Sequence, residues 1–325
     1  MATNLFAVTG DAVARVREEE DGWAVSLALE GSGARCVAVD PGRARTIYVG
    51  AGGSGVWRSE DAGESWEKTA LRQSAVFSIA VGSDGALYAG CEPSMLFRSS
   101  DGEEWEELEA LRRLPSAPTW SFPPRPWTSH VRAIAPSPHD PSLLLVGIEL
   151  GGVMLSDDGG ETWHDHRSGA QRDAHAIAWH ADVHGRAYEA GGGGAAWSFD
   201  GGWTWEPADA GRDRHYTWAL AVDPVDPDRW YVSASPGPHS AHRVGHADAR
   251  LYRWGGGCWE ELTGGLPDPL DAMPYALHVG DGRLFAGLAD GGIYSSADSG
   301  ESWNRLSLRG DRLRSILALT SIRLG

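Results

Sequence analysis

The sequence predicts an all-β fold: a seven-bladed β-propeller with four-stranded blades, occupying residues 1–325 as a single domain. Short segments of alternating apolar and polar residues, rich in β-branched and aromatic side chains, recur along the chain. A turn of the form Ser-x-Asp-x-Gly-x-x-Trp recurs between them. The tryptophans that end these turns, or their counterparts, lie 39 to 58 residues apart, which is close to the period of propeller blades. The seven tryptophans are Trp23, Trp66, Trp105, Trp163, Trp205, Trp259 and Trp303.

Each repeat is interpreted as four strands. Six segments match a first strand and six match a second, and a glycine-rich turn then leads to a shorter third strand such as GVWRS at 55–59. The fourth strand follows the tryptophan. The expected first strands are 35–41, 76–82, 131–137, 175–181, 217–223 and 275–281, and the expected second strands are 46–52, 86–92, 143–149, 186–192, 229–235 and 283–289.

The first repeat lacks its own first strand. Residues 5–10, 12–18 and 23–31 match the second, third and fourth strands, and the missing pattern occurs at the other end of the chain, at 313–319. We therefore expect a C-terminal strand to complete the N-terminal blade. Closing the ring in this way leaves no free sheet edge at the junction.

The recurrent turn is expected to be structural. It is intact at 59–66, 156–163, 198–205 and 296–303, and degenerate at 99–105 and around Trp259. Its Ser and Asp side chains can accept hydrogen bonds from backbone N–H groups, its glycine can adopt a positive φ, and its tryptophan can bury a large apolar face. We interpret it as a clip between the third and fourth strands, and its aspartates are not assigned to catalysis or metal binding.

This clip resembles the Asp-box, or BNR repeat, of sialidases, xyloglucanases, sortilin-type receptors and photosystem assembly factors. The resemblance implies a β-propeller, but that superfamily contains both enzymes and binding proteins. Sialidases carry an RIP motif near the start, which is absent here; xyloglucanases pair two propellers, whereas this chain has room for one. Photosystem assembly factors are expected to display an arginine-rich patch, which suits an acidic chain poorly. The broad class that remains is the glycosyl-hydrolase-like BNR-repeat proteins.

The charge and composition of the chain limit the classes of partner and the location that we expect. A formal net charge of −17 repels phosphate groups, so nucleic acid and anionic membranes are not expected as partners. No apolar run is long enough to span a bilayer, and the first residues do not form a signal peptide, so we expect a cytoplasmic protein. The three cysteines are far apart and suggest neither a disulfide framework nor a zinc site. No cofactor and no metal are expected.

Two insertions are expected on the face opposite the clips. The insertion at 106–130 carries Trp120, Phe122, Trp127 and His130, which either bind a sugar ring or another flat surface or fold back over blade edges. Its segment 115–128 is a candidate surface for a protein partner. The insertion at 236–250 carries His239, His242, His246 and Asp248, whose spacing would suit a metal only in a helix.

The candidate site is the mouth of the central channel, where first strands begin and second strands end. The expected catalytic residues are Glu149, Asp173, Glu189 and His175; the expected ligand-binding residues are Arg35, Trp127, His130, Arg132, Arg214, His215, Tyr216, Trp218, His242, His246 and Tyr275. Carboxylates crowded beside histidines can have shifted pKa values and act as acid and base. The alternative is a solvated channel in which these charges only hold neighbouring blades together.

Three functions follow from this interpretation. The first is a propeller that binds a small polar ligand or a glycan at the channel mouth. The second is a glycoside-hydrolase-like enzyme that uses a carboxylate pair, which must lie about 5 Å or about 6.5–9.5 Å apart. The third is a protein–protein scaffold that uses the outer rim or the loop at 115–128.

Overall fold

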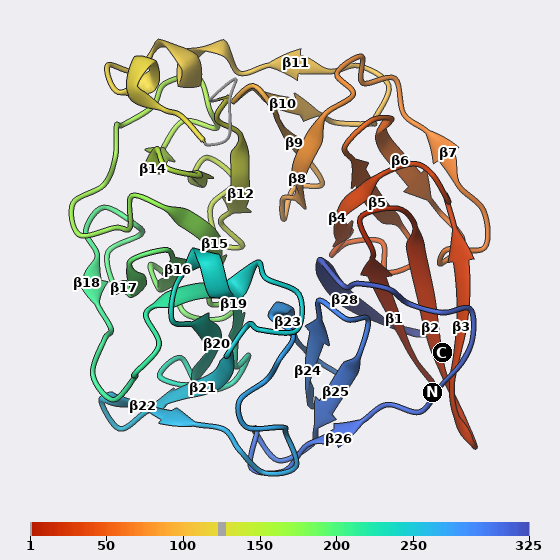
Figure 1. Ribbon diagram of the computed structural model, residues 1–325. Coiled ribbons are helices and arrows are strands. Elements are labelled where there is room, and N and C mark those ends of the chain that lie inside the picture. The colour runs from red at the N-terminus through yellow and green to blue at the C-terminus, as the bar shows by residue number, and fades with distance from the viewer. Residues whose placement is uncertain (1, 123–127, 325) are drawn as a thin grey trace.

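Seven sheets, almost entirely antiparallel, are arranged as blades in a ring (Figure 1). The computed structural model describes residues 2–122 and 128–324. The first blade contains β1 (Ala2–Val8), β2 (Val13–Glu19) and β3 (Gly22–Ala28), with β28 (Ala318–Leu324) on its inner side and β27 (Leu308–Gly310) on its outer side. The predicted seven-bladed, all-β fold is confirmed.

The next three blades follow in chain order. The second contains β4 (Ala34–Val39), β5 (Ile47–Ala51), β6 (Gly55–Ser59) and β7 (Glu67–Lys68). The third contains β8 (Val76–Val81), β9 (Leu87–Cys91), β10 (Leu96–Ser99) and β11 (Glu106–Glu107). The fourth contains β12 (Val131–Pro136), β13 (Leu144–Ile148) and β14 (Gly152–Ser156), and the isolated bridge between Leu155 and His164 stands in place of its outer strand.

The last three blades have four strands each. The fifth contains β15 (Ala174–Trp179), β16 (Ala187–Gly191), β17 (Gly194–Ser198) and β18 (Glu206–Pro207). The sixth contains β19 (Tyr216–Val222), β20 (Trp230–Ser235), β21 (Arg250–Gly255) and β22 (Cys258–Glu261). The seventh contains β23 (Pro274–Gly280), β24 (Arg283–Leu288), β25 (Ile293–Ser296) and β26 (Asn304–Arg305). Short helices lie at η1 (Glu109–Arg113), η2 (Ala117–Thr119) and α1 (Pro238–Ala241), and no helix in the described part of the chain could cross a bilayer.

A C-terminal strand closes the ring, as expected, but it begins later in the chain than predicted. β28 pairs with β1 in antiparallel register over seven residues, from Ala2 opposite Leu324 to Val8 opposite Ala318. The predicted strand at 313–319 therefore begins five residues too early. Leu313 and Ile316 are nevertheless buried, because this non-strand segment packs against the seventh blade, where the Ile316 N–H donates to the Leu288 carbonyl. The apolar residues of this segment therefore reflect burial against the seventh blade and not pairing in a strand.

Neighbouring blades pack closely on the second strand of each sheet. All residues of β5, β9, β13 and β16 are buried, because both faces of these strands are covered by adjacent blades. Glycine occurs where the next blade's inner strand approaches: a Cβ at Gly50 would lie 2.6 Å from Val76 Cγ1, and one at Gly90 would lie 2.5 Å from Val131 Cγ1. These glycines set the spacing between blades.

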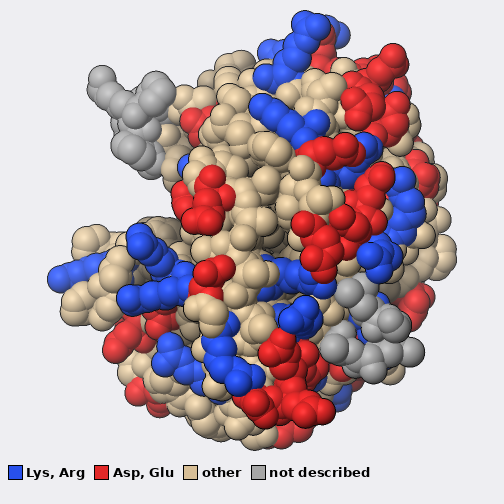
Figure 2. Space-filling view, turned by 90° about the vertical axis from the view of Figure 1, so that its right-hand side faces the viewer, with Lys and Arg blue, Asp and Glu red and all other residues tan. Residues whose placement is uncertain are grey.

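Arginines on the outer part of several blades connect each blade to the clip of the next. Arg98 in β10 donates to the Gly159 carbonyl at 2.9 Å and pairs with Glu161 at 3.2 Å. The same arrangement recurs for Arg58 with Asp101 and Glu103, and for Arg253 with Ser299 and Glu301. Figure 2 shows acidic and basic side chains lying side by side on one flank of the molecule. Part of the acidic surface is thus used to join blades.

The recurrent turn forms the expected clip. In the copy at 156–163, Ser156 Oγ accepts the Gly160 N–H at 2.8 Å and Asp158 Oδ1 accepts the Thr162 N–H at 2.8 Å. The Trp163 indole N–H donates to the Gly160 carbonyl at 3.1 Å, and the φ of Gly160 is 97°. The degenerate copy at 99–105 keeps the Ser and Asp hydrogen bonds, whereas Trp259 lies in a plain hairpin between β21 and β22.

Replacing Asp158 with alanine should lower the free energy of unfolding by about 1–2 kcal/mol, because one side chain organises the whole turn. Urea unfolding followed by tryptophan fluorescence measures the change. Asp157→Ala is the matched control, since Asp157 is half-exposed and, among the described residues, its one ion pair is with His164, at 3.3 Å. Equal losses in the two variants would contradict a structural role for the clip aspartate.

Candidate functional site

A β-bulge occurs near the start of six inner strands, at the end of the channel opposite the clips. In each, the pairing register with the second strand skips a residue, and such a bulge leaves a residue unpaired and redirects its side chain. The skipped residues are Arg35, Phe77, Arg132, His175, Trp218 with Ala219, and Tyr275. A ring of side chains of very different chemistry is therefore produced by one repeated backbone feature.

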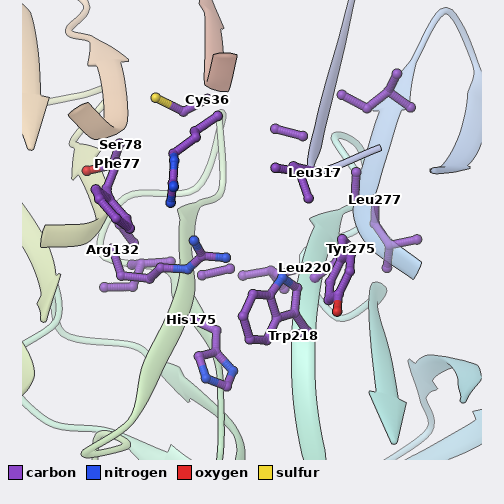
Figure 3. Close-up of a pocket in the computed structure, with 18 of the residues that line it drawn as sticks. Cys36, Phe77, Ser78, Arg132, His175, Trp218, Leu220, Tyr275, Leu277 and Leu317 are labelled. Carbon is purple, nitrogen blue, oxygen red and sulfur yellow. The ribbon is translucent and has the colours of Figure 1, made fainter. Parts of the chain in front are cut away.

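These side chains surround a cavity of about 490 Å³ at the channel mouth (Figure 3). All seven of these bulge residues line it, together with Leu317, which directly precedes β28, and His242 from the insertion at 236–250. Arg132 reaches toward the centre between Phe77 and Trp218, with His175 and Tyr275 close by (Figure 3). The size is that of a site for a small organic ligand.

Two guanidinium groups face this cavity. Arg35 is exposed, lies with its Cζ 4.5 Å from the centre of the Phe77 ring, and has no ion pair among the described residues. The Arg132 Cζ lies 4.5 Å from the centre of the Trp218 ring. Its Nε is 3.7 Å from Glu149 Oε2 and forms no hydrogen bond within the described structure. Two guanidinium groups therefore face the cavity of an acidic protein.

A buried acid–histidine cluster lies beside the cavity. Glu149 follows β13, and its Oε2 is 2.7 Å from His130 Nε2. Burial raises the pKa of the Glu149 carboxyl, but the hydrogen bond with His130 and the charge of Arg132 outweigh burial, so the net pKa is lowered. His130 itself is buried against the Phe77 ring, with ring centres 4.1 Å apart. Glu149 is thus held as a carboxylate.

Asp173 and His175 complete this cluster from the start of β15. Asp173 is partly exposed, and its Oδ2 lies 3.4 Å from His175 Nε2. His175 is buried, and its other ring nitrogen, Nδ1, lies 2.6 Å from the Thr217 carbonyl oxygen. One ligand atom from each of Glu149, Asp173 and His175 lies within 4.8 Å of the others. The structure therefore brings together three of the four residues expected to be catalytic.

Glu189, the fourth, does not line the cavity. It is completely buried in β16, where Oε2 accepts the Gln171 N–H at 2.9 Å and Oε1 has no hydrogen-bond partner among the described residues. Burial raises its pKa to about 8, against a smaller lowering effect of the Gln171 hydrogen bond. An enclosed carboxyl outside the cavity lining is poorly placed to reach a ligand in the channel, and a catalytic role of Glu189 stays a prediction.

The insertion at 236–250 supplies one wall of the site. His242 follows α1, and its two ring nitrogens lie 3.0 Å from the Tyr216 hydroxyl and 2.8 Å from the Tyr275 hydroxyl. Tyr216 is buried and its ring packs against His175, with centres 5.0 Å apart. The predicted residues His242, Tyr216 and Tyr275 thus form one hydrogen-bonded group, in which Tyr275 and His242 face the cavity.

Several other predicted ligand-binding residues lie away from the cavity lining. Arg214 is held by ion pairs with Asp213 at 2.7 Å and with Asp248 at 2.9 Å, so it anchors the insertion. His215 and His246 are exposed and do not line the cavity. Trp127 lies outside the described residues, so its predicted role stays a prediction.

The described part of the insertion at 106–130 folds back on the fourth blade. Trp120 is buried with Leu108, Leu111 and Ile148, and its indole N–H donates to Ser116 Oγ at 2.9 Å. Of the two alternatives for these aromatics, covering a blade edge is therefore correct for Trp120. Phe122 contacts the His130 ring, with centres 5.2 Å apart.

Sequence reasoning missed Phe77 and Leu317 as cavity residues. Phe77 occupies the same position after the start of its inner strand as Arg35 and Arg132 do in theirs. An alignment of the repeats would have shown that Phe77 is equivalent to Arg35 and Arg132, but an apolar residue inside VFSIAVG is expected to lie in the core. Only the bulge directs the side chain at this position into the channel.

Comparisons with known proteins support the fold alone. No protein-family profile matches the sequence, and no curated protein sequence matches it. A GH74 xyloglucanase from Xanthomonas campestris is similar in structure, with a TM-score of 0.62 and 20% identity over 84% of this chain and 45% of that one. A GH74 enzyme from Niastella koreensis has a TM-score of 0.70 and 16% identity over 92% and 51%. YCF48 bound to D1 peptide has a TM-score of 0.56 and 14% identity over 93% and 85%.

The chain therefore spans about half the length of the two GH74 enzymes. It resembles two GH74 enzymes, one of them a xyloglucanase, and the protein YCF48 in a form bound to a peptide. At these identities the likeness establishes architecture, and function has to be argued from the site.

Proposed function

We propose that this protein is a binding propeller whose channel-mouth pocket takes a small polar ligand carrying an acid group, such as an acidic sugar. The observation that carries the proposal is the pair of guanidinium groups, Arg35 and Arg132, that face a cavity of about 490 Å³. Guanidinium groups bind carboxylates through charge-assisted, often bidentate hydrogen bonds. In a chain of net charge −17, an anion is also favoured beside these two guanidinium groups over most other places on the surface.

The remaining lining suits the rest of such a ligand. Trp218, Tyr275 and Phe77 offer flat apolar surface, which packs against sugar rings and other small rings. The Tyr275 hydroxyl and the ring of His242 offer polar atoms that can hydrogen-bond to hydroxyl groups. The pocket therefore combines charge recognition with a face for stacking.

The second candidate function is that of a glycoside hydrolase. It is supported by the approach of Glu149 and Asp173 within 4.8 Å, near the separation of about 5–5.5 Å used by retaining enzymes, and by the likeness to GH74 folds. Two observations favour binding instead. Glu149 is 4% exposed and hydrogen-bonded to His130, and GH74 chains contain about as much again as this chain spans. Turnover of glycans by the wild type, lost in Asp173→Asn, would establish the enzyme.

A protein scaffold is the third possible function, and the likeness to YCF48 bound to a peptide supports it. The buried packing of Trp120 uses part of the 115–128 loop internally, which reduces what that loop can offer a partner.

The pocket is tested by replacing its cations. Arg35→Gln and Arg132→Gln should each weaken binding of acidic sugars and small carboxylic acids about 10- to 100-fold, because each removes a charge-assisted pair. Isothermal titration calorimetry against a panel of these acids and their neutral analogues measures the loss. Arg45→Gln is the control, since Arg45 contacts the Asp61 carbonyl on the clip face.

The wild type should prefer an acid to its neutral analogue, and the control should match the wild type. Equal binding of the acid and the analogue, or equal losses in Arg45→Gln, would overturn the proposal.

A further inference from the structure

One group of three metal-ligating side chains occurs among the described residues: Glu149, Asp173 and His175, with ligand atoms within 4.8 Å of one another. We propose that this group binds a divalent transition-metal ion, Zn²⁺ or Mn²⁺, beside the channel-mouth pocket. The site itself stands on geometry; only its role toward the ligand rests on the proposed function.

His175 is oriented as a metal ligand. Its Nδ1 lies 2.6 Å from the Thr217 carbonyl oxygen, which can only accept, so Nδ1 carries the proton of the neutral ring. The lone pair of the neutral ring then lies on Nε2, which is buried and makes no hydrogen bond in the described structure. Histidines that bind metals commonly donate their other ring nitrogen to a backbone carbonyl in this manner.

The two carboxylates present oxygen atoms to the same point. Asp173 Oδ2 lies 3.4 Å from His175 Nε2, and Asp173 Oδ1 is buried without a hydrogen bond among the described residues. Two lone-pair atoms that face each other at this distance repel unless a cation or a proton lies between them. Glu149 completes the group, and His130 orients it through Oε2 at 2.7 Å.

The ligand set selects the class of ion. One imidazole and two carboxylates suit Zn²⁺ or Mn²⁺, whereas Ca²⁺ and Mg²⁺ prefer sets made of oxygen alone. Zinc binds such atoms at about 2.0–2.2 Å, so side-chain shifts of about 0.5–1 Å would close the group around an ion. Arg132 lies beside Glu149, whereas no arginine or lysine pairs with Asp173 among the described residues, which leaves the Asp173 carboxylate for a cation.

The position of the site would let a bound ion contact a ligand in the cavity. His175 lines the cavity and Asp173 is partly exposed, so an ion held there has coordination positions open to the pocket. Three protein ligands with open positions are typical of metal sites that engage a bound molecule. An acid group held by Arg35 and Arg132 could take one of these positions.

The test starts from protein freed of metal with EDTA. Titration with ZnCl₂ and, separately, MnCl₂ by calorimetry, followed by elemental analysis after gel filtration, should show one ion per chain. His175→Gln and Asp173→Asn should each weaken binding at least 10-fold, since a ligand is lost. Far-UV circular dichroism in EDTA checks that both variants are folded, and Asp173→Asn serves if His175→Gln is not.

The matched controls are His164→Gln and Asp157→Asn. This pair lies 3.3 Å apart, is exposed, and offers the same chemistry on the clip face. The controls should bind the ion as the wild type does. No uptake by the wild type would mean that no ion binds this group, and equal uptake by Asp173→Asn would mean that the ion binds elsewhere; either result would overturn the inference.

The two proposals fail separately. Metal uptake without any binding of acids would leave the metal site standing and remove the proposed ligand. Binding of acids in EDTA that depends on Arg132, with no metal uptake, would do the reverse.

Discussion

Replacing Glu189 with glutamine should stabilise the protein at pH 8 by on the order of 3 kcal/mol, with little effect at pH 5. Burial raises the pKa of Glu189 to about 8 in the folded protein, from a usual value of 4.5. Between these pH values the folded state holds a proton that the unfolded state has released. The free energy of unfolding therefore falls as the pH rises through this window, and glutamine, which stays neutral, removes that loss.

The structure allows the substitution. Glutamine has the shape of the protonated acid, and its amide oxygen can still accept the Gln171 N–H that Glu189 now accepts at 2.9 Å. Urea unfolding of wild type and variant at pH 5 and pH 8 measures the effect, and all other titrating groups cancel in the difference. Glu206→Gln, an exposed glutamate in β18, makes the same chemical change without burial. A difference between Glu189→Gln and wild type that is the same at both pH values would contradict the argument.

Replacing Trp230 with alanine should cost about 3–5 kcal/mol of stability. Trp230 is completely buried between the fifth and sixth blades, and its ring centre lies 5.3 Å from that of Tyr188, 6.3 Å from Trp254 and 4.6 Å from Trp259. Removing the indole would leave a large cavity that the surrounding rings, held on strands of two sheets, can fill only in part.

Two further variants sharpen this prediction. Trp230→Phe should lose much less than the alanine variant, because the Trp230 Nε1 has no hydrogen-bond partner in the described structure and only volume is removed. Phe199→Ala is the control, since that ring is 53% exposed. Urea unfolding compares all three. An alanine variant no less stable than the phenylalanine variant would show that packing at this position does not hold the two blades together.

Much of the channel-mouth site could be predicted from the order of strands in each repeat. Antiparallel strands place the start of every first strand and the end of every second strand at one end of the ring. Arg35, Arg132, His175 and Trp218 were found on that basis and do line the cavity. Glu189 satisfied the same rule and yet lies enclosed, because the rule names the end of a strand but not the face on which a side chain lies.

The blades and the clips could be predicted from the sequence, because strand alternation and the Ser, Asp and Gly hydrogen bonds of each turn act between near neighbours. Closure of the ring by a C-terminal strand could be predicted too, but the apolar, buried Leu313 and Ile316 made that strand look longer than it is, and it begins at Ala318. Which side chains meet in the channel depends on the packing of whole sheets and could be known only from the fold. Six bulges aim them there, and the cluster of Glu149, Asp173 and His175 joins two different blades. Such contacts depend on how separate sheets pack, and no local sequence pattern encodes the distance between side chains on two different blades.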